Sequence, residues 1–329
     1  MLWSLNLKRA TVAWSIMAVC LGVLLVQAGC SPAATANEGD VQPSGEGARI
    51  LVTTDFGKEV VLDAVVPVTP ELSAMEALQK VADVDTSYGG GFVSGINGIG
   101  TGVSGGSAKL DWFYSINGFT ARTGAASYVL RDGDIEHWDY RSWSFRRNVS
   151  ATLGAFPAAF VRGYGGNVRG SVVIHGTGFQ HEAGTLAAFL RTAGSPHVDV
   201  VPLDAATHEA FADNNVVVIG PYESPPVQEV NANWDRLGLF ACFDGASLST
   251  YGPGGEERGT CSDSCGAVFA IQNMWSPGGT GACESMSLIV TGSDESAVRD
   301  AADVLITKHP DLVQLTGILV QGDTWQPLP

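Results

Sequence analysis

The residues of this chain that could do chemistry are cysteines and histidines, and four of the cysteines come as a group. These are Cys242, Cys261, Cys265 and Cys283. In an exported protein, an even set at this density is typical of two disulfides, and the sequence leaves three pairings open. The alternative is a zinc site with four thiolate ligands, but structural zinc sites favour two closely spaced pairs. Only Cys261 and Cys265 form such a pair, so we predict disulfides.

The histidines and carboxylates form no catalytic pattern. His175, His181 and Glu182 suggest a metal, but their spacing matches no helical zinc motif, and ordinary polar loop residues explain them. No Gly-Lys-Ser/Thr sequence completes a P-loop. No Ser/His/Asp set is apparent, although linear order leaves one open. We therefore predict that the protein is not an enzyme and has no intrinsic cofactor or metal.

The N-terminus has the pattern of a secretory signal. Lys8 and Arg9 precede an apolar run from about residue 13 to residue 26, and Cys30 follows where a bacterial lipoprotein is cleaved and acylated. Gln27 stands where a lipobox usually has an aliphatic residue. The alternative is an uncleaved membrane anchor in which Cys30 is an ordinary thiol. Both alternatives place the rest of the chain outside the cytoplasm.

We predict a lipoprotein signal peptide over residues 1–29, lipidation at Cys30, and a flexible tether over residues 30–47. The tether is rich in Ala, Ser, Gly and Pro, as is typical of linkers. The mature protein would be extracytoplasmic and held at the cell membrane by its lipid.

The charge balance argues against nucleic acid as a partner. The formal net charge is −16, and loss of the signal leaves 16 basic residues against 34 acidic ones, or −18. Phosphate backbones repel such a surface. The 41 glycines suit turn-rich β and α/β structure.

A run of aromatic residues is the strongest sign of a binding surface. Asn117-Gly118 and Asp132-Gly133-Asp134 supply turns between two alternating strands. Alternation in the first strand separates Leu110, Trp112, Tyr114 and Ile116 from Asp111, Phe113 and Ser115. In the second strand it separates Trp138 and Tyr140 from His137, Asp139 and Trp143. Because both faces carry rings, we expect one face in a core and the other in contact with something else.

Residues before this run predict a sheet covered by a helix. Residues 49–54 and 60–66 flank Asp55-Phe56-Gly57, which indicates a β-hairpin. Ser73 and Glu76 form a capping box that begins an amphipathic helix. We predict an α+β domain over residues 48–146.

Five motifs in this domain occur in a specific order. They are the capped helix, GFVSGING at 91–98, WFYSING at 112–118, GAASYVL at 124–130, and DGD at 132–134 before WDY at 138–140. With them, the segment from about residue 62 to residue 143 resembles the DUF4430 family, which is similar to the C-terminal β-domain of transcobalamin and intrinsic factor. The resemblance implies a ubiquitin-like β-grasp fold.

The resemblance also implies contact with a corrinoid, a cobalamin-like ring. The contacts would come from Phe92, Val93, Ser94, Gly95, Ile96, Trp112, Phe113, Tyr114, Ser115 and Asn117. This chain lacks the α/α barrel that closes the pocket in transcobalamin-like proteins, so these residues would form half of a pocket. The other half would come from the second domain, a partner, or nothing. His137 is the one candidate axial cobalt ligand inside the motifs, although a single strand histidine is more often a hydrogen-bonded bystander.

Beyond an aromatic connector at residues 147–166, the pattern changes to an α/β domain over residues 167–329. Continuous apolar runs alternate with helical patterns, which predicts a mostly parallel sheet covered on both faces. Ligands of such sheets lie at the carboxyl ends of the strands, here the loops at 175–178, 220–223, 272–273 and 291–294. Asp294 is expected to cap a helix. Residues 216–221 and 288–302 resemble the terminal α/β domain of some prokaryotic S-layer and surface proteins.

Two functions from different classes follow. The first is an extracytoplasmic lipoprotein that binds a corrinoid or similar small molecule and passes it to a transporter of the ECF or ABC type. The alternative is a non-catalytic cell-envelope protein that binds polysaccharide or protein through exposed Trp112, Trp138 and Trp143.

Overall fold

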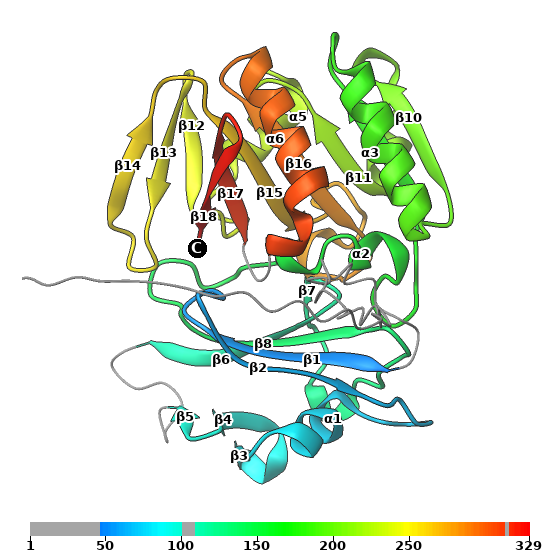
Figure 1. Cartoon of the computed structure of the whole chain (residues 1–329), viewed down its shortest axis with the longest axis vertical. Coiled ribbons are helices and arrows are strands. Elements are labelled where there is room, and N and C mark those ends of the chain that lie inside the picture. The colour runs from blue at the N-terminus through cyan, green and yellow to red at the C-terminus, as the bar shows by residue number, and fades with distance from the viewer. Residues whose placement is uncertain (1–46, 101–108, 313–315) are drawn as a thin grey trace, which may run out of the picture. The chain divides into compact units, whose positions relative to one another are not determined.

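The computed structural model describes residues 47–100, 109–312 and 316–329. The predicted signal peptide, Cys30 and almost all of the predicted tether lie outside these residues. None of the helices in the described ranges is long and apolar enough to cross a membrane. The structure mixes α and β elements and consists mostly of sheets, with few helices (Figure 1).

The first region is built on a five-stranded sheet with the order β2-β1-β8-β6-β7. β1 pairs with β2 in the predicted hairpin, and Asp55, Phe56 and Gly57 in its turn all take positive φ. β1 also pairs in parallel with β8, while β6 is antiparallel to both β8 and β7. The strands are β1 (Ala48–Thr54), β2 (Glu59–Val66), β6 (Leu110–Ile116), β7 (Phe119–Thr120) and β8 (Ile135–Ser142).

Helix α1 (Ala74–Val81) begins at the predicted capping box. The Ser73 hydroxyl accepts a hydrogen bond from the Glu76 amide at 3.2 Å, and the Glu76 carboxylate accepts one from the Ser73 amide at 2.9 Å. The helix buries Ala74, Met75, Ala77 and Leu78. After it comes a small antiparallel sheet of β3 (Val84–Ser87), β4 (Phe92–Ile96) and β5 (Ile99–Gly100).

The connector at residues 147–166 packs between the two regions. It contains α2 (Ala158–Val161), and Phe156, Phe160 and Tyr164 are buried in a core cluster that includes residues of both regions. Farther along the chain, the Gln272 side-chain amide donates to the carbonyl oxygens of Thr120 and Ser150 at 3.2 and 2.8 Å. The two regions therefore share one continuous core.

The second region is built on a seven-stranded sheet with the order β10-β9-β11-β16-β15-β17-β18. One face packs against α3 and α6, and the other packs against α5 and the small sheet β12-β13-β14. The strands of the large sheet are β9 (Ser171–His175), β10 (Val198–Pro202), β11 (Asn215–Ile219), β15 (Gly266–Gln272), β16 (Met286–Gly292), β17 (Gly317–Gln321) and β18 (Thr324–Leu328). The covering elements are α3 (Gln180–Ala193), α4 (His208–Ala212), α5 (Pro225–Ala232), β12 (Ala241–Asp244), β13 (Ser247–Tyr251), β14 (Glu257–Cys261) and α6 (Glu295–Lys308).

This sheet is mixed, which corrects the prediction that it is mostly parallel. β10, β9, β11 and β16 are parallel, but β15 is antiparallel to β16 and to β17, and β17 is antiparallel to β18. Parallel neighbours need a crossover connection, usually a helix. The connection from β15 to β16 contains only a short 3-10 turn, Gly279–Gly281, so the chain returns beside the strand it has left. Continuous apolar runs mark β9, β10, β11, β15 and β16, of which only β15 runs against the predicted direction, and the sequence reasoning missed β17 and β18.

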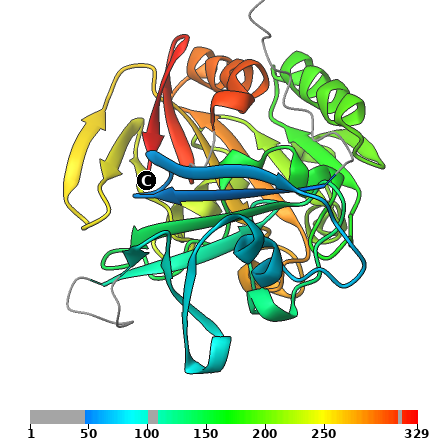
Figure 2. The ribbon, with the colours of Figure 1, turned by 60° about the horizontal axis from the view of Figure 1, so that its bottom comes forward.

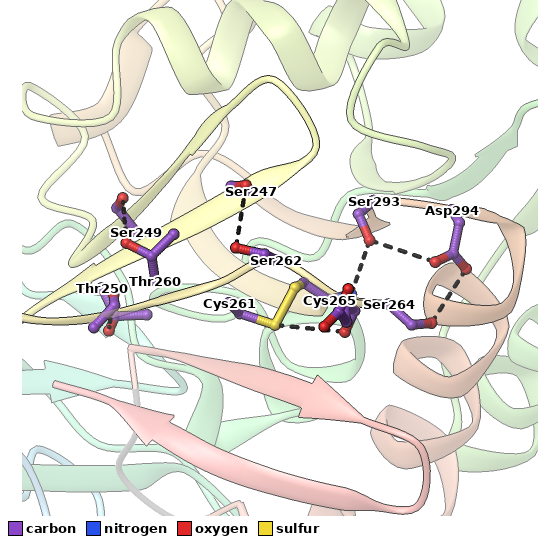
Figure 3. Close-up of a disulfide and its surroundings, with 12 residues drawn as sticks. Ser247, Ser249, Thr250, Thr260, Cys261, Ser262, Ser264, Cys265, Ser293 and Asp294 are labelled. Atoms are coloured by element: carbon purple, nitrogen blue, oxygen red, sulfur yellow. Dashed lines mark hydrogen bonds between the residues drawn. A yellow bond between two sulfur atoms is a disulfide. The ribbon is translucent and has the colours of Figure 1, made fainter.

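One of the two predicted disulfides is present. Cys261 and Cys265 are bonded to each other and join the end of β14 to the start of β15 (Figure 3). The Cys265 amide also donates to the Ser293 hydroxyl at 2.8 Å. The predicted second disulfide is wrong, because Cys242 and Cys283 are free. Cys242 lies on β12, whereas Cys283 is buried with its thiol against the carbonyl oxygen of Thr120.

Candidate functional site

The structure brings together the two segments predicted to contact a ligand. β4 contacts β6, and the Trp112 indole of β6 donates to the carbonyl oxygen of Ile99 in the neighbouring β5 at 3.2 Å. Val93, Gly95 and Ile96 are buried, whereas Phe92 and Ser94 alternate with them and are half-buried. Only part of the predicted β4 contact surface is therefore accessible in this structure.

β6 is more buried than its aromatic sequence suggested. Trp112 is 7% exposed, and its ring packs against that of Tyr140 with 5.2 Å between centroids. Tyr114 is half-buried and stacks on Trp138 at 4.7 Å. Trp138 is 4% exposed. Trp112 and Trp138 are therefore not exposed, as the alternative function required, because both rings lie in the core.

Trp143 is the third tryptophan named for that alternative, and it is half-buried. Its indole donates to Asp111 at 3.0 Å, and the Lys109 ammonium lies 5.8 Å from its ring centroid. This ring is therefore partly covered by neighbouring polar side chains.

Asn117 is fully buried, and its side chain is used within the protein. Its amide nitrogen donates to Asp134 Oδ1 at 2.8 Å and to the carbonyl oxygen of Gly163 at 2.9 Å. Its side-chain oxygen accepts from the Ile135 amide at 2.9 Å. At φ +51° it begins the turn from β6 to β7. In this structure Asn117 positions the turn and offers no free group to a ligand.

The opposite face of the sheet contacts the second region, as the aromatic residues on both faces suggested. The Arg141 guanidinium lies 4.8 Å from the Phe113 ring centroid and 5.5 Å from that of Phe56. Phe56 in turn packs edge-on against Phe240 at 5.1 Å. Phe113 therefore belongs to a contact between the two regions, and Ser115 on the same face is buried.

His137 lies on this same face and is 5% exposed. Thr53 donates its hydroxyl proton to Asp139 at 2.8 Å, so the Nε2–H of His137 donates to the Thr53 oxygen at 2.8 Å. This buried hydrogen bond accounts for the histidine, which is not available as an axial cobalt ligand.

Burial shifts the pKa values of several groups in this sheet. It raises the pKa of Glu136 to about 8, although the Trp138 indole donates to this carboxyl at 2.6 Å. It lowers the pKa of His137 to about 4, against the opposing effect of the Asp139 carboxylate. It also raises the pKa of Asp134. These groups are structural, because all three are buried.

The most exposed ring of the first region was missed by sequence reasoning. Tyr88 is 82% exposed and packs edge-on against Phe92, with 6.4 Å between centroids. The two rings flank a glycine run at the turn of the hairpin formed by β3 and β4, which projects away from the sheet in Figure 2. The sequence signal that could have identified this pair is the run of three glycines with an aromatic residue on each side. We refer to Tyr88 and Phe92, with the glycines between them, as the aromatic hairpin.

In the second region, three of the four predicted loops lie together at the carboxyl ends of the parallel strands. The loops at 175–178, 220–223 and 291–294 follow the parallel strands β9, β11 and β16. Gln272 and Asn273 end the antiparallel β15, so they lie at the amino ends of the parallel strands. Asp294 caps α6 as predicted, accepting from the Ala297 amide at 2.9 Å.

His175 and Glu182, which the sequence analysis interpreted as ordinary polar residues, each have a partner within the protein. Glu182 pairs with Arg299 at 3.4 Å, and His175 bonds to the carbonyl oxygen of Gly176. Within the described ranges, no group of three or more His, Cys, Asp or Glu side chains is arranged to hold a metal ion.

The loop after β9 opens onto a groove of about 810 Å³. Phe211 and Trp275, which sequence reasoning did not select, contribute aromatic rings to it. They are far apart in the sequence and carry no motif, so only the fold identifies them.

These features define a mixed α and β protein in which a five-stranded sheet with one capped helix packs on a seven-stranded α/β sheet. Residues 72–142 match the family described as Domain of unknown function (DUF4430). This segment therefore belongs to DUF4430, as the five motifs predicted. No curated protein matches the sequence.

Proposed function

We propose that the protein is an extracytoplasmic lipoprotein whose DUF4430 domain binds a corrinoid, or a similar flat amphipathic molecule, and passes it to a membrane transporter. The observation that carries the proposal is the aromatic hairpin, which presents Tyr88 and Phe92 within the DUF4430 segment. An N-terminal lipid would keep this surface near the membrane and raise its local concentration at a transporter.

The arrangement of strands supports a β-grasp assignment for residues 48–146. The strand order β2-β1-β8-β6-β7 places parallel β1 and β8 at the centre of a mixed sheet. α1 packs its buried residues into the same core as Trp112 and Trp138. In the resembling proteins this fold closes over a corrinoid, which is why we extend that role to this domain.

The aromatic hairpin has the chemistry that a corrin ring requires. Such a ligand needs apolar cover for its ring and hydrogen-bonding partners for its rim amides. Tyr88 and Phe92 supply the apolar cover. Gly89 and Gly90 have positive φ, and a Cβ at either position would meet no atom within 4 Å, so the backbone between the rings is open to a ligand.

The missing half of the pocket would come from a partner. The second region contacts the five-stranded sheet through Phe240 and Phe56, on the face that also carries Phe113 and His137. α1 and the core tryptophans occupy the other face. An open half-site suits transfer, because a receptor can cover the exposed side of the ligand before the hairpin releases it.

Titration of residues 40–329, which form one compact unit, tests this proposal. Cyanocobalamin and cobinamide should both bind saturably, with similar affinity, because the contacts would be to the corrin ring and not to cobalt. Changing Tyr88 and Phe92 together to Ala should weaken binding by about thirtyfold, since each of the two ring contacts is worth about 1 kcal/mol. Isothermal titration calorimetry measures both effects.

A matched control is available in the second region. Tyr222 stacks on Phe243 at 5.6 Å, so Tyr222→Ala removes a comparable ring pair outside DUF4430 and should leave corrinoid binding unchanged. Absence of binding at high micromolar concentrations of both corrinoids would overturn the proposal.

A further inference from the structure

One end of the groove in the second region, at the loop after β9, lies where the sheet changes the side of its connections, and the other end is formed by Phe211 and Trp275. β9 and β11 are adjacent and parallel. The chain leaves β9 for α3, which packs on one face of the sheet, and leaves β11 for α5, which packs on the other. The loops after the two strands separate there, and such switch points are where open α/β sheets bind ligands.

The groove is lined by hydroxyl, amide, imidazole and carboxylate groups. His175, Thr177 and Gln180 come from the β9–α3 segment, Asp204, Thr207 and His208 come from the segment after β10, and Glu229 comes from α5. Among the described residues that line the groove there is no Lys or Arg. A ligand rich in hydroxyl donors would meet several acceptors here, Asp204 and Glu229 among them.

His175 is held in place at the start of the groove. It is 4% exposed, and its Nδ1 lies 2.9 Å from the carbonyl oxygen of Gly176. Because a carbonyl only accepts, Nδ1 carries a proton and donates this hydrogen bond. His175 is also one of the residues that line the groove.

The aromatic wall of the groove is held rigidly. Phe211 and Trp275 pack edge-on at 4.9 Å with 61° between their planes, and the Trp275 indole donates to Glu229 at 2.8 Å. Asn273 is fully buried and links the backbones of both residues. Its amide donates to the carbonyl oxygen of Phe211 at 2.7 Å, and its oxygen accepts from the Trp275 amide at 2.9 Å.

This wall is a platform, not a cage. The two rings contact each other edge-on, so they do not enclose a cation between parallel faces, as aromatic cages for quaternary ammonium groups do. A flat apolar surface beside carboxylate and hydroxyl acceptors is complementary to a sugar ring, which has an apolar face and a rim of hydroxyl groups.

We propose that this groove is a second ligand site and that its ligand is a neutral saccharide. The sugar ring packs on Trp275, and its hydroxyl groups donate to Glu229. This site is independent of the corrinoid proposal, because it uses no residue of the DUF4430 segment.

The test is isothermal titration calorimetry of residues 40–329 with chitotriose, cellotriose and maltotriose, each at concentrations up to millimolar. At least one trisaccharide should bind saturably. Trp275→Ala should weaken that binding by about tenfold. The control is Trp325→Ala, which removes a half-buried indole from β18, outside the groove, and should leave the affinity unchanged.

A second variant and a second probe establish the class of ligand. Glu229→Gln keeps a side-chain oxygen as acceptor but removes the charge, so saccharide binding should fall by less than about fivefold and should not depend on salt. Spermidine is the cationic probe. Binding of spermidine without any trisaccharide, or binding abolished by Glu229→Gln and by salt, would overturn the saccharide assignment. Failure of all three trisaccharides to bind, or equal affinity of wild type and Trp275→Ala, would also overturn it.

Discussion

The two regions of this molecule differ in whether they bury charged side chains. In the described residues, every buried Asp, Glu and Arg side chain lies in or beside β8, at Asp134, Glu136, Asp139, Arg141 and Arg146. In the described part of the second region, the buried polar side chains are hydroxyls, amides and His175. The pH dependence of stability should therefore arise in the first region, while the second should be held mainly by apolar burial.

The two candidate sites differ in a second respect. Trp275 in the groove is fixed by the buried Asn273, whereas the aromatic hairpin projects with Tyr88 mostly exposed. A preorganised site loses less free energy on binding than one that must be ordered by its ligand. The groove is thus suited to act alone, and the hairpin is suited to act with a partner.

The largest expected effects concern one buried asparagine in each region. Asn117→Ala and Asn273→Ala should each lower the free energy of unfolding by about 3 kcal/mol, because each change leaves buried backbone or carboxyl groups without partners. Urea unfolding measures both losses. Asn97→Ala is the matched control, since Asn97 also begins an Asn-Gly turn at positive φ but is exposed. Equal losses for Asn97→Ala and Asn117→Ala would contradict the role assigned to the buried amide.

The next largest effect is a pH dependence of stability that arises from the first region alone. Burial raises the pKa of Glu136 from 4.5 to about 8, so the native state holds a proton that the unfolded state has lost in this range. Stability is then full below pH 4.5 and falls as the pH rises toward 8, by up to about 1.4 kcal/mol per pH unit. Glu136→Gln should remove this slope, as measured by urea unfolding across that range. An unchanged slope in the variant would show that the pH dependence of stability does not come from Glu136.

His137 should give a smaller effect of opposite sign. Burial lowers its pKa from 6.5 to about 4, so the unfolded state binds a proton that the native state does not. Stability should therefore fall as the pH drops from 6.5 toward 4, and His137→Gln should reduce that acid sensitivity. Thermal unfolding at several pH values in this window measures the difference. Equal acid sensitivity of the two proteins would argue against a buried neutral imidazole.

The smallest effect is expected at the aromatic hairpin. Because Tyr88 is 82% exposed, Tyr88→Ala should change the free energy of unfolding by less than about 0.5 kcal/mol. Urea unfolding measures this change. A large loss would mean that the ring supports the fold, and the comparison between a fixed groove and an open hairpin would then fail.

Much of the local structure could be predicted from the sequence. The β1–β2 hairpin, the Ser73 capping box and the Asp294 cap depend on residues a few positions apart, so their patterns can be read directly. The alternation of β6 correctly gave two faces and indicated that both make contacts, but it could not identify what covers each face. The burial of Trp112 and Trp138 depends on α1 and on packing across the sheet.

The sequence by itself determined the elements, the DUF4430 segment and one close cysteine pair, because these follow from local periodicity, capping and short spacing. Tertiary structure alone decided that β15 runs antiparallel, that Cys242 and Cys283 stay apart, and that Phe211 meets Trp275. Each of these depends on which distant segments become neighbours. That choice is made by burial of apolar area over the whole core, which no short stretch of sequence records.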